Sequence, residues 1–471
     1  MTDTVLERAA ASVAAARPAA VPADGLPPAQ RRWAMVALMT GVSMASLDTA
    51  IANTALPELA RQLHAGAAAS VWIVNIYQLA MVATLLPFAA LGERVGYRRV
   101  ATAGLALFTL ASLACALAWS LPLLVGARLL QGLGASALMG VTTAMMRAIY
   151  PARLQGQGFG LNALVVAVAF AVGPTLASLI LALAAWPWLF AINVPIGAAA
   201  FLLARRVLPD NARAAHGFDT AAALCNAGAF GLLILVLGDA AHGAAPARLA
   251  VEAVGTFACF TLLLRRQRGQ AAPILPTDLL ARPLFALSAL TAVCTFAVQS
   301  LAFVALPFHF EQVLGRSPVE TGFLLTPWPV LVAIMGPVSG RLSDRYESGL
   351  LAGLGLLVLC AGVLALLWMP AAPATIDIAW RMAVCGAGFG LFQAPNMKAI
   401  MGSAPRERAG GASGIVATAR LTGQASGAAL VAGCLVLSDR HGTTYALAAA
   451  AAIAFLGAAI SFARLHRRVR G

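Results

Sequence analysis

The sequence predicts an all-α, polytopic membrane protein with fourteen transmembrane helices, and three observations predict it. Of the 471 residues, 61% are hydrophobic and only 11% are charged, whereas about a quarter of the residues of a soluble domain are charged. Most of the chain divides into apolar runs of about 20 residues, the length that crosses a bilayer as a helix. The basic residues gather in alternate connections between these runs, as the positive-inside rule requires.

The apolar runs are separated mostly by short connections that leave no room for a soluble domain. Backbone groups in lipid must form their hydrogen bonds internally, and the runs are too long for barrel strands, so we expect helices. They fall at about residues 33–57, 70–91, 99–119, 121–146, 156–183, 186–204, 219–238, 245–264, 283–308, 320–340, 349–369, 375–400, 410–437 and 442–463.

Arginine and lysine set the predicted orientation. With the N-terminus inside, 25 of the 32 basic residues lie in inner segments, and the outer loops hold only Arg61, Arg248, Arg316 and Arg440. This asymmetry predicts a bacterial cytoplasmic (inner) membrane protein with both termini in the cytoplasm. The net charge of +14 is therefore an orientation signal, and it does not indicate nucleic acid as a partner.

A weak internal repeat predicts two related halves. Gly92-Glu93-Arg94-Val95-Gly96-Tyr97-Arg98-Arg99 and Gly340-Arg341-Leu342-Ser343-Asp344-Arg345 occupy two inner loops, and a span with a buried arginine follows each of them. Duplicated halves around a central site are a transporter architecture. The predicted domains are a disordered cytoplasmic tail at 1–32, a six-helix bundle at 33–208, a two-helix insertion at 209–281, a second six-helix bundle at 282–464 and a cytoplasmic tail at 465–471.

An acid and an arginine at similar depth form the main candidate site. Asp48 lies about 14 Å inside the outer end of the first run, and Arg128 lies about 10 Å inside the outer end of the fourth. A carboxylic acid inside a membrane helix costs roughly 2.5–3.5 kcal/mol, so it needs a partner or a function. We predict that Asp48 exchanges a proton, and a cationic substrate, under the influence of Arg128. The alternative is a fixed ion pair that only joins the two helices.

Gly173 and Pro174 in the fifth run predict a gate, because a proline in mid-span kinks the helix and small residues let another helix approach. Close packing without gating is the alternative. The first inner loop predicts a latch that closes the inner side through charge pairs and helix-end contacts, and an ordinary charged turn is the alternative. The candidate latch residues of both loops are Gly92, Glu93, Arg94, Gly96, Arg98, Arg99, Asp344 and Arg345.

Five further polar residues are candidates for a substrate cavity, namely Asn53, Gln131, Asn396, Arg420 and Glu311. For Glu311, a charge at the membrane interface is the alternative reading. The seven cysteines lie inside apolar runs without metal-ligand spacing, which favours small buried side chains over a disulfide framework or a metal site. There is no nucleotide-binding loop or nucleophile constellation, so we predict neither an enzyme with catalytic residues nor a cofactor.

Several motifs of the sequence resemble those of the fourteen-span drug:proton antiporters of the EmrB/QacA type within the major facilitator superfamily. Leu47-Asp48, Asn53 and Ala55-Leu56-Pro57 are similar to the motif of the first span, and Arg128-Leu129-Leu130-Gln131-Gly132-Leu133-Gly134 to that of the fourth. Gly173-Pro174 falls where the antiporter motif has its Gly-Pro, and Trp186-Pro187-Trp188 to Pro195-Ile196-Gly197 is similar to a stretch of this family. The loop at 92–99 resembles the inner-loop motif, with Glu93 where aspartate is usual.

The resemblance implies a major-facilitator fold with a 6+2+6 helix arrangement and proton-coupled multidrug efflux by alternating access. The expected partners are protons, lipophilic cationic small molecules and membrane lipid, while the sequence does not specify a periplasmic adaptor. A narrow exporter of one metabolite or antibiotic is the first alternative. A non-transporting membrane receptor or scaffold is the second, and the lack of a soluble domain speaks against it.

Overall fold

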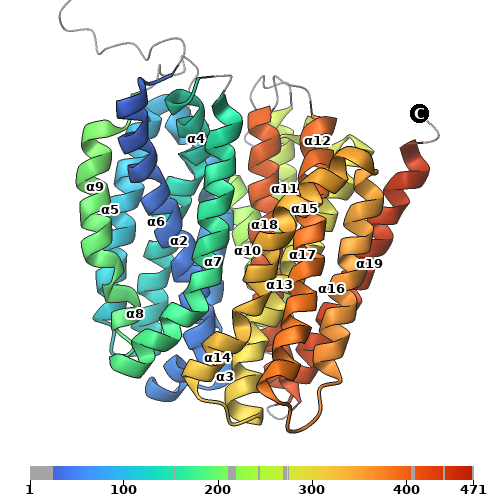
Figure 1. Cartoon of the computed structure of the whole chain (residues 1–471). Coiled ribbons are helices and arrows are strands. Elements are labelled where there is room, and N and C mark those ends of the chain that lie inside the picture. Colours follow the sequence, from blue (N-terminus) through green and yellow to red (C-terminus); the bar gives the residue numbers. More distant parts are fainter. Residues whose placement is uncertain are drawn as a thin grey trace, which may run out of the picture.

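A computed structural model of the chain describes residues 25–151, 154–210, 219–241, 244–268, 273, 275–404, 409–438 and 441–468. Within these ranges every regular element is a helix, and fourteen helical segments are long and apolar enough to cross a membrane. The helices stand side by side along one direction (Figure 1). The predicted all-α fold with fourteen spans is therefore confirmed.

The first helices pack together and are called here the N-terminal group. They are α2 (Pro28–Gln62), α3 (Ala67–Ser70), α4 (Trp72–Val95), α5 (Tyr97–Ala116), α6 (Leu121–Ile149), α7 (Gln155–Leu183), α8 (Trp188–Ala191) and α9 (Asn193–Val207).

The start of α2 differs from the prediction. Proline at the first helical position lacks the N–H that a helix start leaves unpaired, and α2 accordingly begins at Pro28. The backbone N–H of Leu26 donates to the Ile149 carbonyl at the end of α6, at 3.0 Å. Ordered chain thus reaches into the predicted disordered tail, whose residues 1–24 lie outside the described ranges.

The last helices form a second group, called here the C-terminal group. They are α12 (Thr277–Leu280), α13 (Pro283–Phe308), the π-helix η2 (His309–Val313), α14 (Pro318–Leu325), α15 (Pro327–Arg345), α16 (Ser348–Leu367), α17 (Thr375–Ser403), α18 (Ala409–Leu437) and α19 (Gly442–Arg468). A capping box formed by Ser317 and Glu320 starts α14, because each side chain satisfies a backbone N–H that the helix leaves free.

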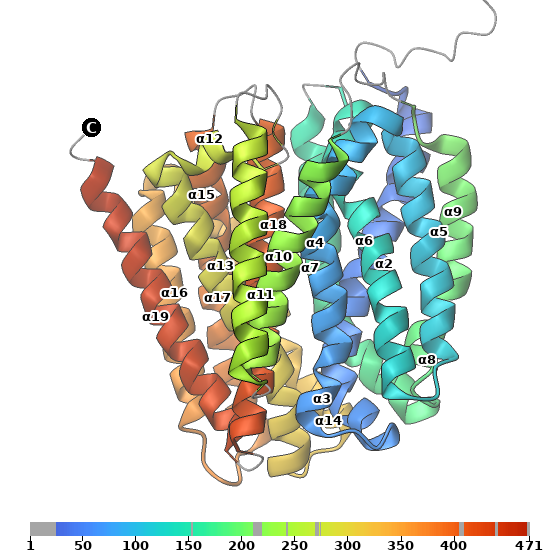
Figure 2. The same cartoon turned by 180° about the vertical axis from the view of Figure 1, so that it is seen from behind.

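Between the groups, α10 (Thr220–Ala241) and α11 (Pro246–Gln267) form a helical hairpin. α10 packs against both α4 and α18, and Figure 2 shows it in front of the line where those two helices meet. The Asn226 side chain fastens α10 to α4 by donating to the Ala83 carbonyl at 3.1 Å. α11 exposes Val251, Val254 and Phe257, as expected of a helix that faces lipid.

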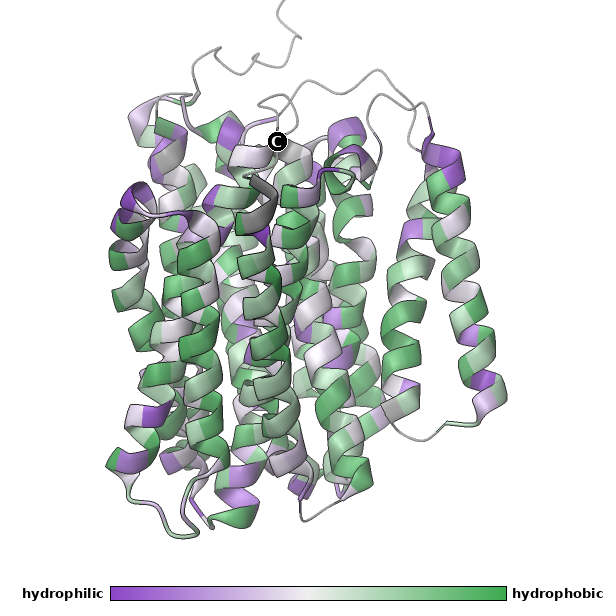
Figure 3. Ribbon diagram, turned by 90° about the vertical axis from the view of Figure 1, so that its right-hand side faces the viewer, coloured by the Kyte–Doolittle hydropathy of each residue, from purple (hydrophilic) through white to green (hydrophobic). Residues whose placement is uncertain are grey.

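The N-terminal and C-terminal groups meet chiefly where α2 packs against α13, α4 against α18, and α7 against α14 and α15. Apolar residues cover the middle height of the molecule and polar residues gather at its two ends (Figure 3). α2 begins and α19 ends at the same end of the molecule (Figure 1). We call this end the inner end, following the sequence prediction, and the opposite end the outer end.

Candidate functional site

Asp48 of α2 and Arg128 of α6 form a buried ion pair. Arg128 Nη1 donates to Asp48 Oδ2, and the side chains of Arg128 and Asp48 are 0% and 1% exposed, respectively. The sequence predicted that the two residues face one another, and the structure brings them together. A buried ion pair is most stable when hydrogen bonds satisfy its remaining polar atoms, and among the described residues only Nη2 of Arg128 lacks such a partner in this pair.

Two amides complete the surroundings of the carboxylate. Asp48 Oδ1 accepts hydrogen bonds from Gln131 Nε2 at 2.9 Å and from Asn193 Nδ2 at 3.3 Å. Gln131 also donates to Ser112 Oγ at 2.8 Å and accepts from Arg128 Nη1 at 2.6 Å. The amide of Gln131, predicted to line a substrate cavity, instead orients the ion pair, and Asn193 of α9 joins it there.

Arg128 is held on its other side by backbone and by aromatic rings. Its Nε donates to the Ile73 carbonyl at 3.0 Å, and its guanidinium lies 4.1 Å from the ring centre of Tyr77. The Tyr77 hydroxyl donates to the Ala45 carbonyl at 3.3 Å. Since Tyr77 also lines the central cavity, its ring separates Arg128 from that cavity.

The central cavity lies where the two groups meet, between α2, α4, α6, α7 and α18, and its free volume is about 20 Å³. This space is sufficient for a single water molecule. The wall residues from α2 are Ala45, Ser46 and Thr49, whereas Asp48 contacts α6 and α9 inside the N-terminal group. Asp48 therefore does not line the cavity in this conformation, contrary to its predicted contact with substrate.

Arg420 of α18, a candidate residue for the substrate cavity, lines the central cavity. Its closest hydrogen-bonding contact is Met139 Sδ, at 3.9 Å from Nη2. Among the described residues it forms no ion pair. The cavity thus contains a cation whose charge is not balanced by a neighbouring side chain.

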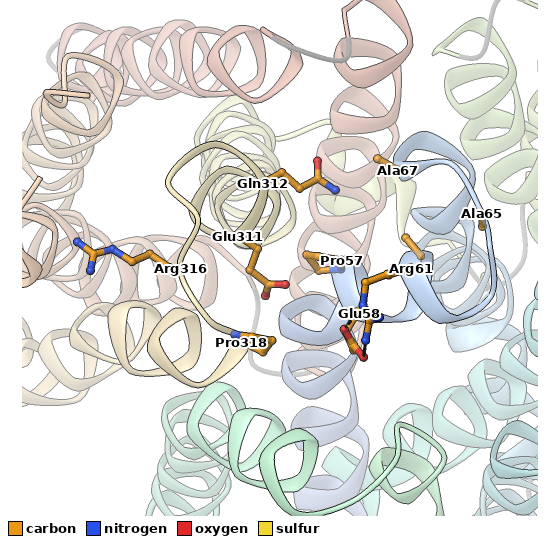
Figure 4. A pocket seen from close by; sticks show the side chains of 10 residues that line it. Pro57, Glu58, Arg61, Ala65, Ala67, Glu311, Gln312, Arg316 and Pro318 are labelled. Carbon is orange, nitrogen blue, oxygen red and sulfur yellow. Dashed lines mark hydrogen bonds and ion pairs between the residues drawn. The ribbon is translucent and has the colours of Figure 1, made fainter. Parts of the chain in front are cut away.

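A second, larger cavity opens at the outer end, with a volume of about 470 Å³. It lies between α2 and α3 of the N-terminal group and η2 and α14 of the C-terminal group. Figure 4 shows the Glu311 carboxylate pointing into it between Pro57 and Pro318. On the opposite wall Glu58 is paired with Arg61 at 2.5 Å. Glu311, predicted as a cavity residue, therefore lines the outer cavity and not the central one.

Asn396 of α17, predicted to line the substrate cavity, is not among the residues that line the central or the outer cavity in this conformation. Its Nδ2 donates to the Ser288 carbonyl at 3.1 Å, and its Oδ1 accepts from Arg464 Nη1 at 2.8 Å. Arg464 of α19 is itself buried and donates to Ser288 Oγ at 2.8 Å. These contacts join α13, α17 and α19 within the C-terminal group, so Asn396 has a structural role.

Replacing Asn396 with alanine is expected to lower stability without changing substrate preference. The change removes a hydrogen bond to a buried guanidinium, a loss of about 1.5–3 kcal/mol. Asn226→Ala is the matched control, because it removes a neutral hydrogen bond to a backbone carbonyl and should cost about 0.5–1.5 kcal/mol. Thermal unfolding of the purified variants measures the two losses of stability. Equal losses would contradict the structural role of the bond between Asn396 and Arg464.

Asn53 of α2 is 4% exposed, and its Oδ1 has no hydrogen-bond partner among the described residues. It does not line either of the two cavities.

Within the described residues, no three His, Cys, Asp or Glu side chains gather in a way that could hold a metal ion.

Gly173 and Pro174 of α7 lie where α7 packs between α2 and α14. A Cβ atom at Gly173 would collide with the side chain of Ala50 on α2, so glycine allows this close approach. One turn further, Ser178 Oγ donates to the Pro318 carbonyl at 2.7 Å. These contacts place the predicted gate residues at the junction between α2 and α14, towards the outer end.

The first inner loop makes its described contacts inside the N-terminal group. Arg98 Nη2 donates to the Arg205 carbonyl near the end of α9, where the helix dipole favours a positive charge. Gly96 links α4 to α5 with a φ of +107°. Arg94 and Arg99 are exposed and Glu93 is half-buried, while a Cβ atom at Gly92 would lie 2.7 Å from Tyr97 Cδ1.

Gly96→Ala is expected to destabilise the protein by about 1–3 kcal/mol, because an L side chain rarely adopts a positive φ. Gly126→Ala is a suitable control, since no atom lies within 4 Å of a Cβ placed there and alanine is the better helix former. The midpoint of thermal unfolding in detergent compares the two. A Gly96→Ala protein as stable as Gly126→Ala would contradict the argument.

The second inner loop also makes contacts within its own group. Asp344 of α15 pairs with Lys398 Nζ of α17 at 2.9 Å, and the same Nζ donates to the Ser343 carbonyl at 2.7 Å. Arg345 is exposed. The loops correspond in position, but their described partners differ.

Comparison with known proteins identifies similar sequences over most of the chain. A family model described as "Major Facilitator Superfamily" matches residues 38–428. The "Uncharacterized transporter YebQ" of Escherichia coli (strain K12) is 52% identical over 94% of this chain and 98% of its own.

Two more distant relatives bear names that mention a compound. The "Riboflavin transporter RibZ" of Clostridioides difficile (strain 630) is 27% identical over 91% of this chain and 96% of its own. The "Tetracenomycin C resistance and export protein" of Streptomyces glaucescens is 31% identical over 90% and 79%.

Among solved structures, a bacterial homologue of the human lysosomal transporter Spinster, in an inward-facing conformation, has a similar fold. The TM-score is 0.66 at 14% identity, over 93% of this chain and 98% of that one.

Proposed function

We propose a proton-driven export function for this chain, which belongs to the Major Facilitator Superfamily and is therefore a transporter of small molecules and not an enzyme. The proposed cargo is lipophilic organic compounds, moved out of the cell across the bacterial cytoplasmic membrane. We place both termini in the cytoplasm, on the strength of the distribution of basic residues.

The observation that carries the proposal is the buried Asp48–Arg128 pair beside the wall of the central cavity. A proton on Asp48 removes the negative charge that holds Arg128, and an unpaired buried charge is unfavourable by about 3–5 kcal/mol. Relief requires movement of Arg128, and the Tyr77 ring that stacks on it moves as well. Protonation thus biases the wall of the cavity between two arrangements, which is the requirement for coupling.

The driving force is sufficient for export. Each pH unit across the membrane supplies about 1.4 kcal/mol per proton, or a tenfold concentration ratio. The membrane potential adds about 2.3 kcal/mol per 100 mV for each net charge moved.

We assign the outer gate to Gly173 and Pro174 of α7, where they meet α14. Thr175 Oγ1 and Thr326 Oγ1, from the two groups, lie 2.9 Å apart in the same region. Opening the outer side requires that this contact separates. We assign the inner-loop residues to stabilising the other conformation, in which the inner side is closed and the outer side is open. These residues are Glu93, Arg94, Arg98 and Arg99.

The chain could export either many compounds or a single one, and different relatives support each possibility. Export of several drugs is supported by relatives named for drug resistance and export, including the tetracenomycin C protein. Export of one metabolite is supported by the relative named as a riboflavin transporter. A resistance profile of cells that express the chain separates them, since protection against a single compound favours the narrow exporter.

Proteoliposomes with an imposed pH gradient test the coupling. Export of a dye should be accompanied by proton movement in the opposite direction, and a proton ionophore should stop it. Export that continues at the same rate after the gradient has collapsed would refute proton coupling. If none of a broad panel of compounds is exported or causes proton movement, the export function itself is refuted.

A further inference from the structure

We infer that the central cavity binds substrates that carry an acidic group, and that Arg420 is the residue that contacts this anionic group. The inference rests on the proposed export function and adds the charge of the cargo. It differs from the cationic cargo predicted from the sequence, which required Asp48 on the cavity wall.

The first observation is the balance of charge at mid-depth. Asp48, Arg128 and Arg420 lie deep within their spans, and Asp48 and Arg128 neutralise one another in a pair. Arg420 remains, and a guanidinium keeps its proton in a protein. The centre of the molecule therefore has a net positive charge, which repels a cation and attracts an anion.

The second observation is what surrounds Arg420. Its described hydrogen-bonding contact is a thioether sulfur, Met139 Sδ, at 3.9 Å, which is a weak acceptor. A buried guanidinium is stable when an anion or several oxygen acceptors satisfy its five N–H groups. The C-terminal group shows the satisfied arrangement at Arg464, which donates to Ser288, Asn396 and Ser461. Arg420 is half-buried and lacks such a set among the described residues, so its donors are free for a ligand.

The third observation is a pair of unsatisfied polar side chains on the same cavity. Ser46 is 3% exposed and Gln78 is 2% exposed, and both line the cavity with Arg420. Ser46 Oγ and Gln78 Oε1 have no hydrogen-bond partner among the described residues. Leaving such groups buried and unpaired is unfavourable, which indicates that a bound molecule satisfies them in another conformation.

The chemistry of the wall specifies the class of ligand. A guanidinium binds a carboxylate or sulfonate with two parallel hydrogen bonds, and the Ser46 hydroxyl can donate a third. Met81, Phe170 and Leu421 supply apolar wall beside these groups. The ligand is therefore an amphiphilic anion, with an acidic group on a lipophilic body. It enters when the groups separate, because about 20 Å³ is free in this conformation.

The charge of the cargo also changes the energetics. Exchange of one proton for one monovalent cation moves no net charge, whereas one proton entering and one monovalent anion leaving move two positive charges inward. Export of an anion should therefore depend on membrane potential as well as on the pH gradient.

Two dyes of the same skeleton test the inference. 8-Anilinonaphthalene-1-sulfonate carries a sulfonate, and N-phenyl-1-naphthylamine lacks it. Everted vesicles with wild type, Arg420→Met or Arg420→Lys, matched for membrane content, are energised with a pH gradient. The readout is the ratio of the export rates of the two dyes, which a merely structural role of Arg420 would leave unchanged.

Arg420→Met should lower the ratio of sulfonate to neutral dye export about tenfold or more, because bonds to a charged group are lost. Arg420→Lys, which keeps the charge, should recover part of this ratio. An equal loss for both dyes, or a wild type that exports the neutral dye and not the sulfonate, overturns the inference while proton-driven export stands. A wild type that moves neither dye also overturns it, and the proteoliposome panel then decides the export function separately.

Discussion

Asp48→Asn is expected to abolish proton-driven export while the protein still inserts into the membrane. Asparagine has nearly the shape of aspartic acid and cannot exchange a proton, so the Arg128 site remains in one charge state. We expect the pH-gradient-dependent rate to fall by about two orders of magnitude, since the proton step is lost rather than weakened. Dye export and substrate-induced pH change in proteoliposomes measure it together.

A matched double variant separates coupling from folding. Asp48→Asn alone leaves Arg128 buried without a counter-charge, a loss of about 3–5 kcal/mol. Asp48→Asn with Arg128→Gln removes both charges and should recover most of the thermal stability without recovering export. If either protein extrudes dye and moves protons like wild type, Asp48 only joins α2 to α6.

Joining α7 to the junction of α14 and α15 at Thr326 should stop transport. Thr175 Oγ1 and Thr326 Oγ1 are 2.9 Å apart, so cysteine sulfurs at the same two positions come within reach of one another and can approach the bonded distance of about 2.05 Å. Oxidation of Thr175→Cys/Thr326→Cys should therefore form a disulfide that holds the outer ends of the two groups together. We expect export to fall more than about tenfold and to return after reduction, because alternating access requires this contact to open.

The single cysteine variants and wild type are the controls for oxidation. The seven native cysteines are unpaired and buried or half-buried, so oxidant alone should leave wild-type export nearly unchanged. Mass spectrometry of the linked peptide confirms that the bond has formed. Full export by a fully cross-linked protein would show that the outer gate lies elsewhere.

Much of the architecture could be predicted from the sequence because lipid imposes simple rules. Span length and backbone satisfaction alone give fourteen helices, and the part of the chain that the structure describes contains fourteen candidate spans. The pairing of Asp48 with Arg128 could also be predicted, since depth along a span follows from residue number and a buried acid needs a partner.

The directions of side chains could not be predicted, because these helices are apolar on every face and periodicity carries little information. Asn396 was expected in the cavity, whereas its Oδ1 accepts a hydrogen bond from Arg464 of α19. Arg464 itself was counted as an inner-end charge, although it is 2% exposed. Asn193 was not predicted as a site residue. As an amide within an apolar span it could have been recognised as a candidate, but its hydrogen bond to Asp48 depends on how α9 packs against α2.

The position of α10 has a consequence for the route by which the proposed lipophilic cargo could reach the central cavity. Molecules dissolved in the bilayer can reach the middle of such a carrier sideways, wherever the two groups part. α10 covers the line between α4 and α18 and is fastened there by Asn226. Sideways access from the membrane is therefore blocked on that flank, and a dissolved compound must enter along the opposite flank, beside α7 and α15.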